Sequence, residues 1–174
     1  MSAARDFPLA PLPTRTWVLL GALVVLTLGA VFWSMKDMSA DPQRWLVPGL
    51  VVVLVLAALA SIRRRGITLE NEVLVVRASL YTRRVPAAAL KLDEARVLDL
   101  DEHTGFKPLL KTNGYSLPGF HAGNFRLRNG ARAFLLLTGD GRALWLPRHD
   151  DTQALLLSPE RPQVLLDALQ GART

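Results

Sequence analysis

Two long uncharged runs of apolar residues lie close together near the N-terminus, and they constrain this chain more than any other feature. They cover residues 16–34 and 45–62. At a rise of about 1.5 Å per residue, each would form a helix about as long as the hydrocarbon core of a membrane is thick. Trp17 and Trp33 stand near the ends of the first run, where indole rings prefer the headgroup boundary. The pattern predicts two transmembrane helices joined as a hairpin.

Two other interpretations of these runs fit the sequence less well. A cleaved signal peptide usually has a shorter apolar stretch, and here a leader with Pro8, Pro11 and Pro13 precedes the first run. A buried helical hairpin of a soluble protein rarely contains two uncharged runs of this length. We therefore expect an uncleaved hairpin.

Basic residues flank the predicted hairpin on its outer sides. Arg5 and Arg15 precede it, and Arg63, Arg64 and Arg65 follow it directly, whereas the connector between the runs holds two bases and two acids. Because positive residues favour the cytoplasmic side, we expect a multi-pass protein of the plasma (bacterial inner) membrane with both termini in the cytoplasm. The three arginines also predict contact with anionic headgroups, at about 1 kcal/mol each, although a role in topology alone would explain them.

The chain thus divides into a cytoplasmic N-terminal segment (residues 1–15), the two helices (16–62) and a domain (66–174). The domain alternates short strand-like runs with turn residues. Asn129–Gly130 predicts a hairpin, and Gly139 to Gly141 should extend it to a meander. The expected strands are 67–69, 73–76, 80–85, 96–101, 125–128, 131–138, 143–146 and 153–157.

A C-terminal helix is predicted after the last strand. Ser158 suits the N-cap and Pro159 the first helical position. Val164, Leu165 and Leu169 recur at helical spacing and should pack on the sheets.

Several short motifs resemble the bacterial pleckstrin-homology (PH-like) domain in its membrane-anchored form. They are Thr112-Asn113-Gly114-Tyr115, Leu117-Pro118-Gly119-Phe120, Ala122-Gly123-Asn124-Phe125, Asn129-Gly130 and Leu156-Leu157-Ser158-Pro159-Glu160. The resemblance implies an α+β fold, in which a transmembrane hairpin is followed by a partly open β-barrel of about seven antiparallel strands capped by a C-terminal α-helix. It implies no catalytic residues.

Two groups of residues are candidates for recognition. The Gly- and Pro-containing segment 105–123 is expected to form a long loop, where Tyr115, Phe120 and His121 would form a recognition surface. The alternative is that the loop covers an open end of the barrel and buries these aromatic side chains. The second group is a basic face on adjacent strands, formed by Arg126, Arg128, Arg132 and Arg142.

The sequence offers little to support catalysis or metal binding. There is no cysteine, the three histidines are not spaced as metal ligands, and His149-Asp150-Asp151 is more typical of a solvated turn. Ser158 has no base assigned to it. We therefore expect no catalytic residue, no metal and no cofactor.

Net charge of +6 favours anionic surfaces, but the charge is scattered, so no nucleic-acid partner is predicted. The acidic turn Glu70-Asn71-Glu72 argues against phosphoinositide binding there. The leading hypothesis is a non-enzymatic binding or scaffold protein at the cytoplasmic face of the membrane, whose partners are the bilayer, its anionic headgroups, or a protein in the membrane or cytoplasm. The alternative is an accessory subunit that docks into a larger membrane complex through its helices, for which Gly21, Thr27 and Gly29 give a faint hint. A membrane-bound hydrolase is the weakest hypothesis.

Overall fold

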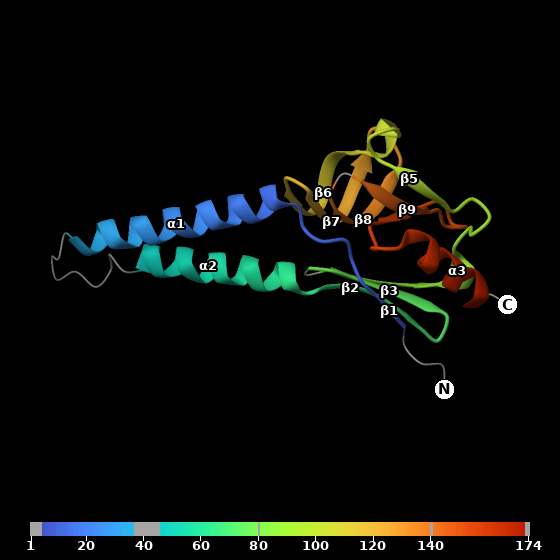
Figure 1. Ribbon diagram of the computed structural model, residues 1–174, viewed down its shortest axis with the longest axis horizontal. Coiled ribbons are helices and arrows are strands. Elements are labelled where there is room, and N and C mark those ends of the chain that lie inside the picture. The colour runs from blue at the N-terminus through green and yellow to red at the C-terminus, as the bar shows by residue number, and fades with distance from the viewer. Residues whose placement is uncertain (1–4, 37–45, 80, 140, 173–174) are drawn as a thin grey trace.

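The protein consists of a pair of long helices that projects from a β-rich domain (Figure 1). The computed structural model describes residues 5–36, 46–79, 81–139 and 141–172. Helix α1 spans Thr14–Lys36 and helix α2 spans Leu46–Arg63, and the two lie side by side. Most of their apolar side chains face outward; Leu26 is 71% exposed, for example, and Leu50 is 59% exposed.

Helix α1 has the length and composition of a membrane span. Among the described residues, the stretch Thr14–Trp33 alone meets both requirements, with a mean hydropathy of 2.1, and only 17% of it is buried inside the protein. Helix α2, predicted as a second span, forms as a helix but does not meet the same requirements within the described part of the chain.

The first sheet has four strands in the order β1-β2-β3-β4. They are β1 Arg5–Phe7, β2 Arg65–Glu70, β3 Val73–Ala78 and β4 Tyr81–Pro86. The two-residue turn between β2 and β3 places both Asn71 and Glu72 at positive φ, as type I′ hairpin turns require. The predicted strands of this region are confirmed, apart from Leu80, which lies outside the described residues, but β1 was not foreseen.

Strand β1 belongs to the leader that precedes α1. It pairs antiparallel with β2, and Leu9 then forms a bridge with Pro159. Leu12 is buried in the core. The described part of the N-terminal segment, which was predicted as a separate part of the chain, therefore contributes a strand and a core residue to the domain.

The second sheet has six strands in the order β5-β9-β10-β8-β7-β6. They are β5 Arg96–Asp99, β6 Pro108–Leu117, β7 Phe120–Leu127, β8 Arg132–Thr138, β9 Arg142–Leu146 and β10 Ala154–Leu157. The hairpin at Asn129–Gly130 is confirmed. The predicted meander is wrong, because β10 lies between β8 and β9 and runs parallel to β8. Its leucines are buried on both faces, which favours a central position in the sheet.

The second sheet buries apolar side chains on both of its faces. One face, with Phe120, Phe134 and Leu144, packs on the first sheet. The opposite face, with Leu127 and Leu135, is covered by the connection between β5 and β6. The two sheets do not close into one barrel, so the predicted partly open barrel is two packed sheets.

Helix α3, Pro162–Ala172, covers the core on the side away from the two long helices (Figure 1). Leu165 and Leu169 are fully buried, as predicted, whereas Val164, which was also expected to pack on the sheets, is 49% exposed. The predicted start at Ser158 and Pro159 is wrong. These residues stay extended, because Ser158 accepts a hydrogen bond from the N–H of Ala10.

Candidate membrane-proximal face

The bases of α1 and α2 are held by turns of both sheets. The hydroxyl of Thr16, which is fully buried, donates a hydrogen bond of 2.6 Å to the carbonyl of Pro118 in the β6–β7 turn. The N–H of Gly139, after β8, donates to the carbonyl of Gly119 in the same turn, and the N–H of Ser79, after β3, donates to the carbonyl of Arg64. At this end of the domain, hydrogen bonds thus join the turns to one another and to the bases of the helices.

Gly119 is required where this turn meets the leader. Its φ is +78°, a conformation that side chains with a Cβ rarely adopt. A Cβ built on it would lie 2.3 Å from Cγ of Pro13. The close approach of the turn to Pro13 therefore depends on the absence of a side chain.

The arginines predicted to contact the membrane lie at this end of the domain. Arg64 is exposed and Arg65 is half-buried at the start of β2, whereas the side chain of Arg63 lies outside the described atoms. Atom Nη1 of Arg65 is buried and has no hydrogen-bond partner among the described residues. Burial lowers the pKa of Arg65 from its ordinary value, because removal from water disfavours the charged guanidinium.

The predicted recognition loop is wrong, because most of segment 105–123 forms the hairpin of β6 and β7. Phe120 is fully buried and Tyr115 packs against the same core, so Phe120 offers no surface to a partner. His121 points to the opposite face of the sheet, where its ring lies 5.7 Å from that of Phe125 and its Nδ1 is 3.0 Å from the Ser116 hydroxyl. The predicted alternative, burial of the aromatic side chains, describes Phe120 correctly.

The four arginines of the predicted basic face are not gathered together. Arg126 and Arg132 are directly opposite each other on β7 and β8, and Arg128 is exposed in the turn between these strands. Arg142 begins β9 and lies opposite Asp99 of β5 in the strand register. Because β10 separates β8 from β9, the register places Arg142 level with the far end of β8, about 20 Å from Arg132 at 3.3 Å per residue.

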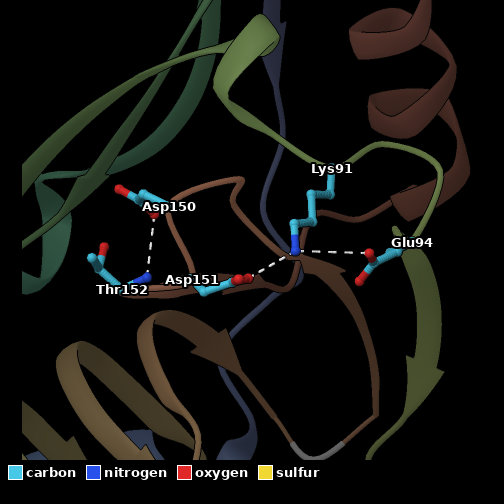
Figure 2. A network of polar contacts seen from close by, with 5 residues as sticks. All are labelled: Lys91, Glu94, Asp150, Asp151 and Thr152. Atoms are coloured by element: carbon cyan, nitrogen blue, oxygen red, sulfur yellow. Dashed lines mark hydrogen bonds and ion pairs between the residues drawn. The ribbon is translucent and has the colours of Figure 1, made fainter.

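A polar network ties the β9–β10 connection to the segment after β4 (Figure 2). The ammonium of Lys91 donates a hydrogen bond of 2.8 Å to Asp151 and lies 3.8 Å from Glu94. The hydrogen bond to Asp151 raises the pKa of Lys91. The network consists of exposed ion pairs, which are typical of a contact that holds two loops together rather than of a reactive centre.

Asp150 belongs to the same connection. Its carboxylate pairs with the guanidinium of Arg148 at 2.6 Å and accepts a hydrogen bond from the N–H of Thr152. Partial burial alone would raise the pKa of Asp150, but the hydrogen bonds from Thr152 and the charge of Arg148 outweigh it and lower the pKa. Within the described ranges, no three histidine, aspartate or glutamate side chains come together as a metal site would need.

The sequence did not indicate that Arg77 and the leader would lie beside Arg65. Arg77 is opposite Gly66 on β3 and Arg65 is opposite Ala78, so the two arginines are on neighbouring strands but their side chains point to opposite faces of the sheet. Counting outward from the two-residue turn at Asn71–Glu72 would have predicted this register. No comparable signal in the sequence points to the leader as a strand.

Two packed sheets with one C-terminal helix define the domain as an α+β module. Residues 65–173, more than half of the chain, match the bacterial PH domain family. The chain therefore belongs to that family, whose domains are generally binding modules rather than enzymes. Strand β1 and both long helices lie outside the matched region. No curated protein and no solved structure matches the chain.

Proposed function

We propose that this chain is a non-catalytic, membrane-anchored PH-domain protein with a binding or scaffold role at the cytoplasmic face of the plasma membrane. In this proposal α1 and α2 cross the membrane as a hairpin, and the domain remains attached to their bases. Tethering keeps the domain at the bilayer surface, where a high effective concentration strengthens contacts that would be weak in solution.

The observation that carries the proposal is the pairing of β1 with β2. These strands are neighbours in one sheet, yet α1 and α2 lie between them in the sequence. A chain that leaves the domain after β1 must return to the same side of a membrane before β2. The pairing therefore favours two crossings over one, and it argues against cleavage behind α1, which would remove a strand of the sheet.

The surfaces of the two helices support the same conclusion. Away from the domain most of their described leucine and valine side chains are exposed, as in helices surrounded by lipid. The flanking arginines at the domain end favour the cytoplasmic side.

The topology is tested with single cysteines, since the chain has none of its own. Pro11→Cys reports on the leader, Ser39→Cys on the connector, and Glu102→Cys on the domain. In intact spheroplasts an impermeant maleimide should label only Ser39→Cys. Permeabilised cells should show labelling of all three.

Labelling of the leader and the domain from opposite sides would disprove the hairpin. Labelling of both from outside would reverse the orientation. Extraction of the chain by alkaline carbonate would show that it is not an integral membrane protein at all.

A further inference from the structure

The inner face of the second sheet ends in two exposed arginines. Alternate side chains of β7 and β8, such as Phe120 and Phe134, belong to the core between the sheets. Arg126 and Arg132 continue the same two rows and lie directly opposite each other, and both are exposed. Nε of Arg126 donates a hydrogen bond of 3.4 Å to the carbonyl of Gly130, which is a neutral acceptor. The sheet therefore brings two like charges together where the core ends.

A third arginine reaches the same place from the first sheet. Arg83 is on the core-facing side of β4, because it is opposite Val76, a core residue. Its guanidinium carbon lies 5.6 Å from the centre of the Phe134 ring. Its Nη2 donates long hydrogen bonds of 3.4 Å to the side-chain oxygens of Asn124 and Gln153. Arg83 thus spans the gap between the two sheets.

The contacts of Arg83 place it beside the other two arginines. Phe134 is two positions from Arg132, and Asn124 is two positions from Arg126, on the same side of the sheet. Two positions along a strand correspond to about 7 Å, so the three arginines share one patch. Arg83, Arg126 and Arg132 are called the arginine cluster below.

The charge of the arginine cluster is not compensated. Among the described residues, no acidic side chain forms an ion pair with it. In the neighbouring β9–β10 connection, Asp150 pairs with Arg148 at 2.6 Å and Asp151 pairs with Lys91 at 2.8 Å. Like charges directly opposite each other on two strands destabilise a sheet. An anionic group bound between the guanidinium groups would remove this repulsion.

An exposed leucine lies next to the arginine cluster. Leu110 of β6 is opposite Arg126, so Leu110, Arg126 and Arg132 stand side by side on neighbouring strands, about 5 Å from one to the next. Leu110 is 58% exposed, and Leu109 beside it is 65% exposed. The surface therefore offers apolar contacts as well as charge. A protein segment would use both, whereas a free anion would use only the charge.

We propose that the arginine cluster and Leu110 bind an acidic segment of a partner protein, with carboxylates on the guanidinium groups and an apolar side chain on Leu110. Guanidinium groups present paired donors that match the two oxygens of a carboxylate. The inference rests on the proposed binding role and adds to it a surface and a class of partner. Arg126 lies about 20 Å along β7 from Phe120, so this surface is separate from the turn at the base of α1.

The test uses the full-length chain in a nonionic detergent and a fluorescent synthetic peptide in which glutamates alternate with leucines. Fluorescence anisotropy measures its Kd. Arg126→Gln and Arg132→Gln should each weaken binding about tenfold, as expected for the loss of charge-assisted hydrogen bonds. Arg142→Gln is the matched control, because it removes the same charge from an exposed position on β9, which β10 separates from β8. It should change the affinity by less than about twofold.

The apolar contact has its own arm. Leu110→Ala should weaken binding about threefold, because it removes apolar area from the contact. Val164→Ala, at a position on α3 that is 49% exposed, is the control and should leave the affinity unchanged. A peptide with serines in place of leucines should bind the wild-type chain and Leu110→Ala equally well. If this peptide still distinguished the two chains, Leu110 would not contact the apolar side chains.

Thermal unfolding without peptide separates recognition from a structural role. Arg132→Gln should raise the melting temperature slightly while it weakens binding, because it removes the repulsion from Arg126. A fall in both would show that Arg132 supports the fold and would overturn its role in binding. Arg83→Lys keeps the charge beside Phe134 but loses the fork, so it should weaken binding less than Arg83→Gln does.

Competitors identify the class of ligand. A peptide with glutamines in place of glutamates should bind at least about tenfold more weakly. Inorganic phosphate and short-chain phosphatidylglycerol should displace the acidic peptide no better than sodium chloride of equal ionic strength does. Stronger displacement by phosphate would indicate a free-anion site, and stronger displacement by the lipid would indicate a headgroup site. Either result would overturn the assignment to a protein segment.

Equal loss of affinity in Arg142→Gln and Arg132→Gln would also overturn the site, because it would mean that only overall charge matters. The cysteine-labelling experiment tests the membrane topology without any peptide. A chain that passes the topology test but binds the acidic peptide without dependence on the arginine cluster contradicts this inference alone.

Discussion

Single residues at the base of α1 decide how the helix is joined to the domain. Thr16 contributes its hydroxyl to the carbonyl of Pro118, and Gly119 lets the same turn approach Pro13. Neither residue stands out in the sequence, where Thr16 begins an apolar run and Gly119 is one of 12 glycines. Their importance follows from a contact between segments about a hundred residues apart.

We predict that Gly119→Ala destabilises the protein by about 1–3 kcal/mol, because the methyl group adds strain at positive φ and clashes with Pro13. Thermal unfolding in mild detergent measures the effect. Gly141→Ala is the control, since its Cβ meets open space. It should change stability by less than about 0.5 kcal/mol. Equal effects of both substitutions would contradict the proposed contact.

The β9–β10 connection should respond to acid through Asp150. A lowered pKa in the folded state means that this carboxylate stabilises the fold above its ordinary pKa of 3.8 and that the contribution is lost as the pH falls through the lowered value. Asp150→Asn keeps an acceptor for Thr152 but carries no charge, so the melting temperature should fall less steeply between pH 5 and pH 2. Glu102→Gln, at an exposed position, serves as the control. An unchanged slope in Asp150→Asn would exclude this source of pH dependence.

At the scale of elements, the leader strand and the β6–β7 hairpin were the hardest to foresee. Strand β6 is polar and exposed along most of its length, so it lacks the alternation that marks a half-buried strand. It forms a strand because its backbone pairs with the edge of β7. Strand β1 is an edge strand with only three paired residues, and the bridge between Leu9 and Pro159 holds the leader just after it.

Leu12→Ala tests whether the leader belongs to the core. Truncation of this buried side chain should cost about 2–4 kcal/mol, because it leaves a cavity between the leader and the sheets. Leu110→Ala makes the same change at a position on β6 that is 58% exposed and should cost less than about 0.5 kcal/mol. If the two substitutions had similar effects on thermal unfolding, the leader would not be packed in solution.

At the scale of the whole molecule, β1 and β2 are antiparallel neighbours, and the segment that connects them in the sequence contains both long helices. The domain is therefore incomplete without the residues that precede α1. This arrangement fixes both bases of the helix pair to one sheet, so the domain and the helices are held together by backbone pairing as well as by side chains.

We predict that residues 64–174 alone fold less stably than the same residues joined through a short flexible linker to residues 1–13. Restoring the leader re-buries Leu12 and part of Phe7, worth about 2–4 kcal/mol. Urea unfolding of the two soluble proteins measures the difference, and Leu12→Ala in the joined protein should remove much of it. Equal midpoints for the two proteins would show that the leader adds nothing to the domain.

By itself, the sequence determined the features that depend on local pattern. Uncharged runs predicted both long helices, the Asn129–Gly130 turn predicted its hairpin, and the spacing of Leu165 and Leu169 predicted the buried face of α3. The motifs in residues 111–160 indicated the family that the match over residues 65–173 shows. Each of these signals lies within a short stretch of chain, where backbone preference and hydrophobic periodicity act directly.

Only the tertiary structure decided which strands are neighbours and therefore which side chains meet. It separated Arg142 from Arg126 and Arg132 by inserting β10, buried Phe120, and placed the leader beside β2. These outcomes depend on pairing between distant segments, where the choice is made by total burial and satisfied hydrogen bonds rather than by local preference. The path of the leader is set in the same way, because β1 pairs with β2 for three residues and Leu9 then forms a bridge with Pro159.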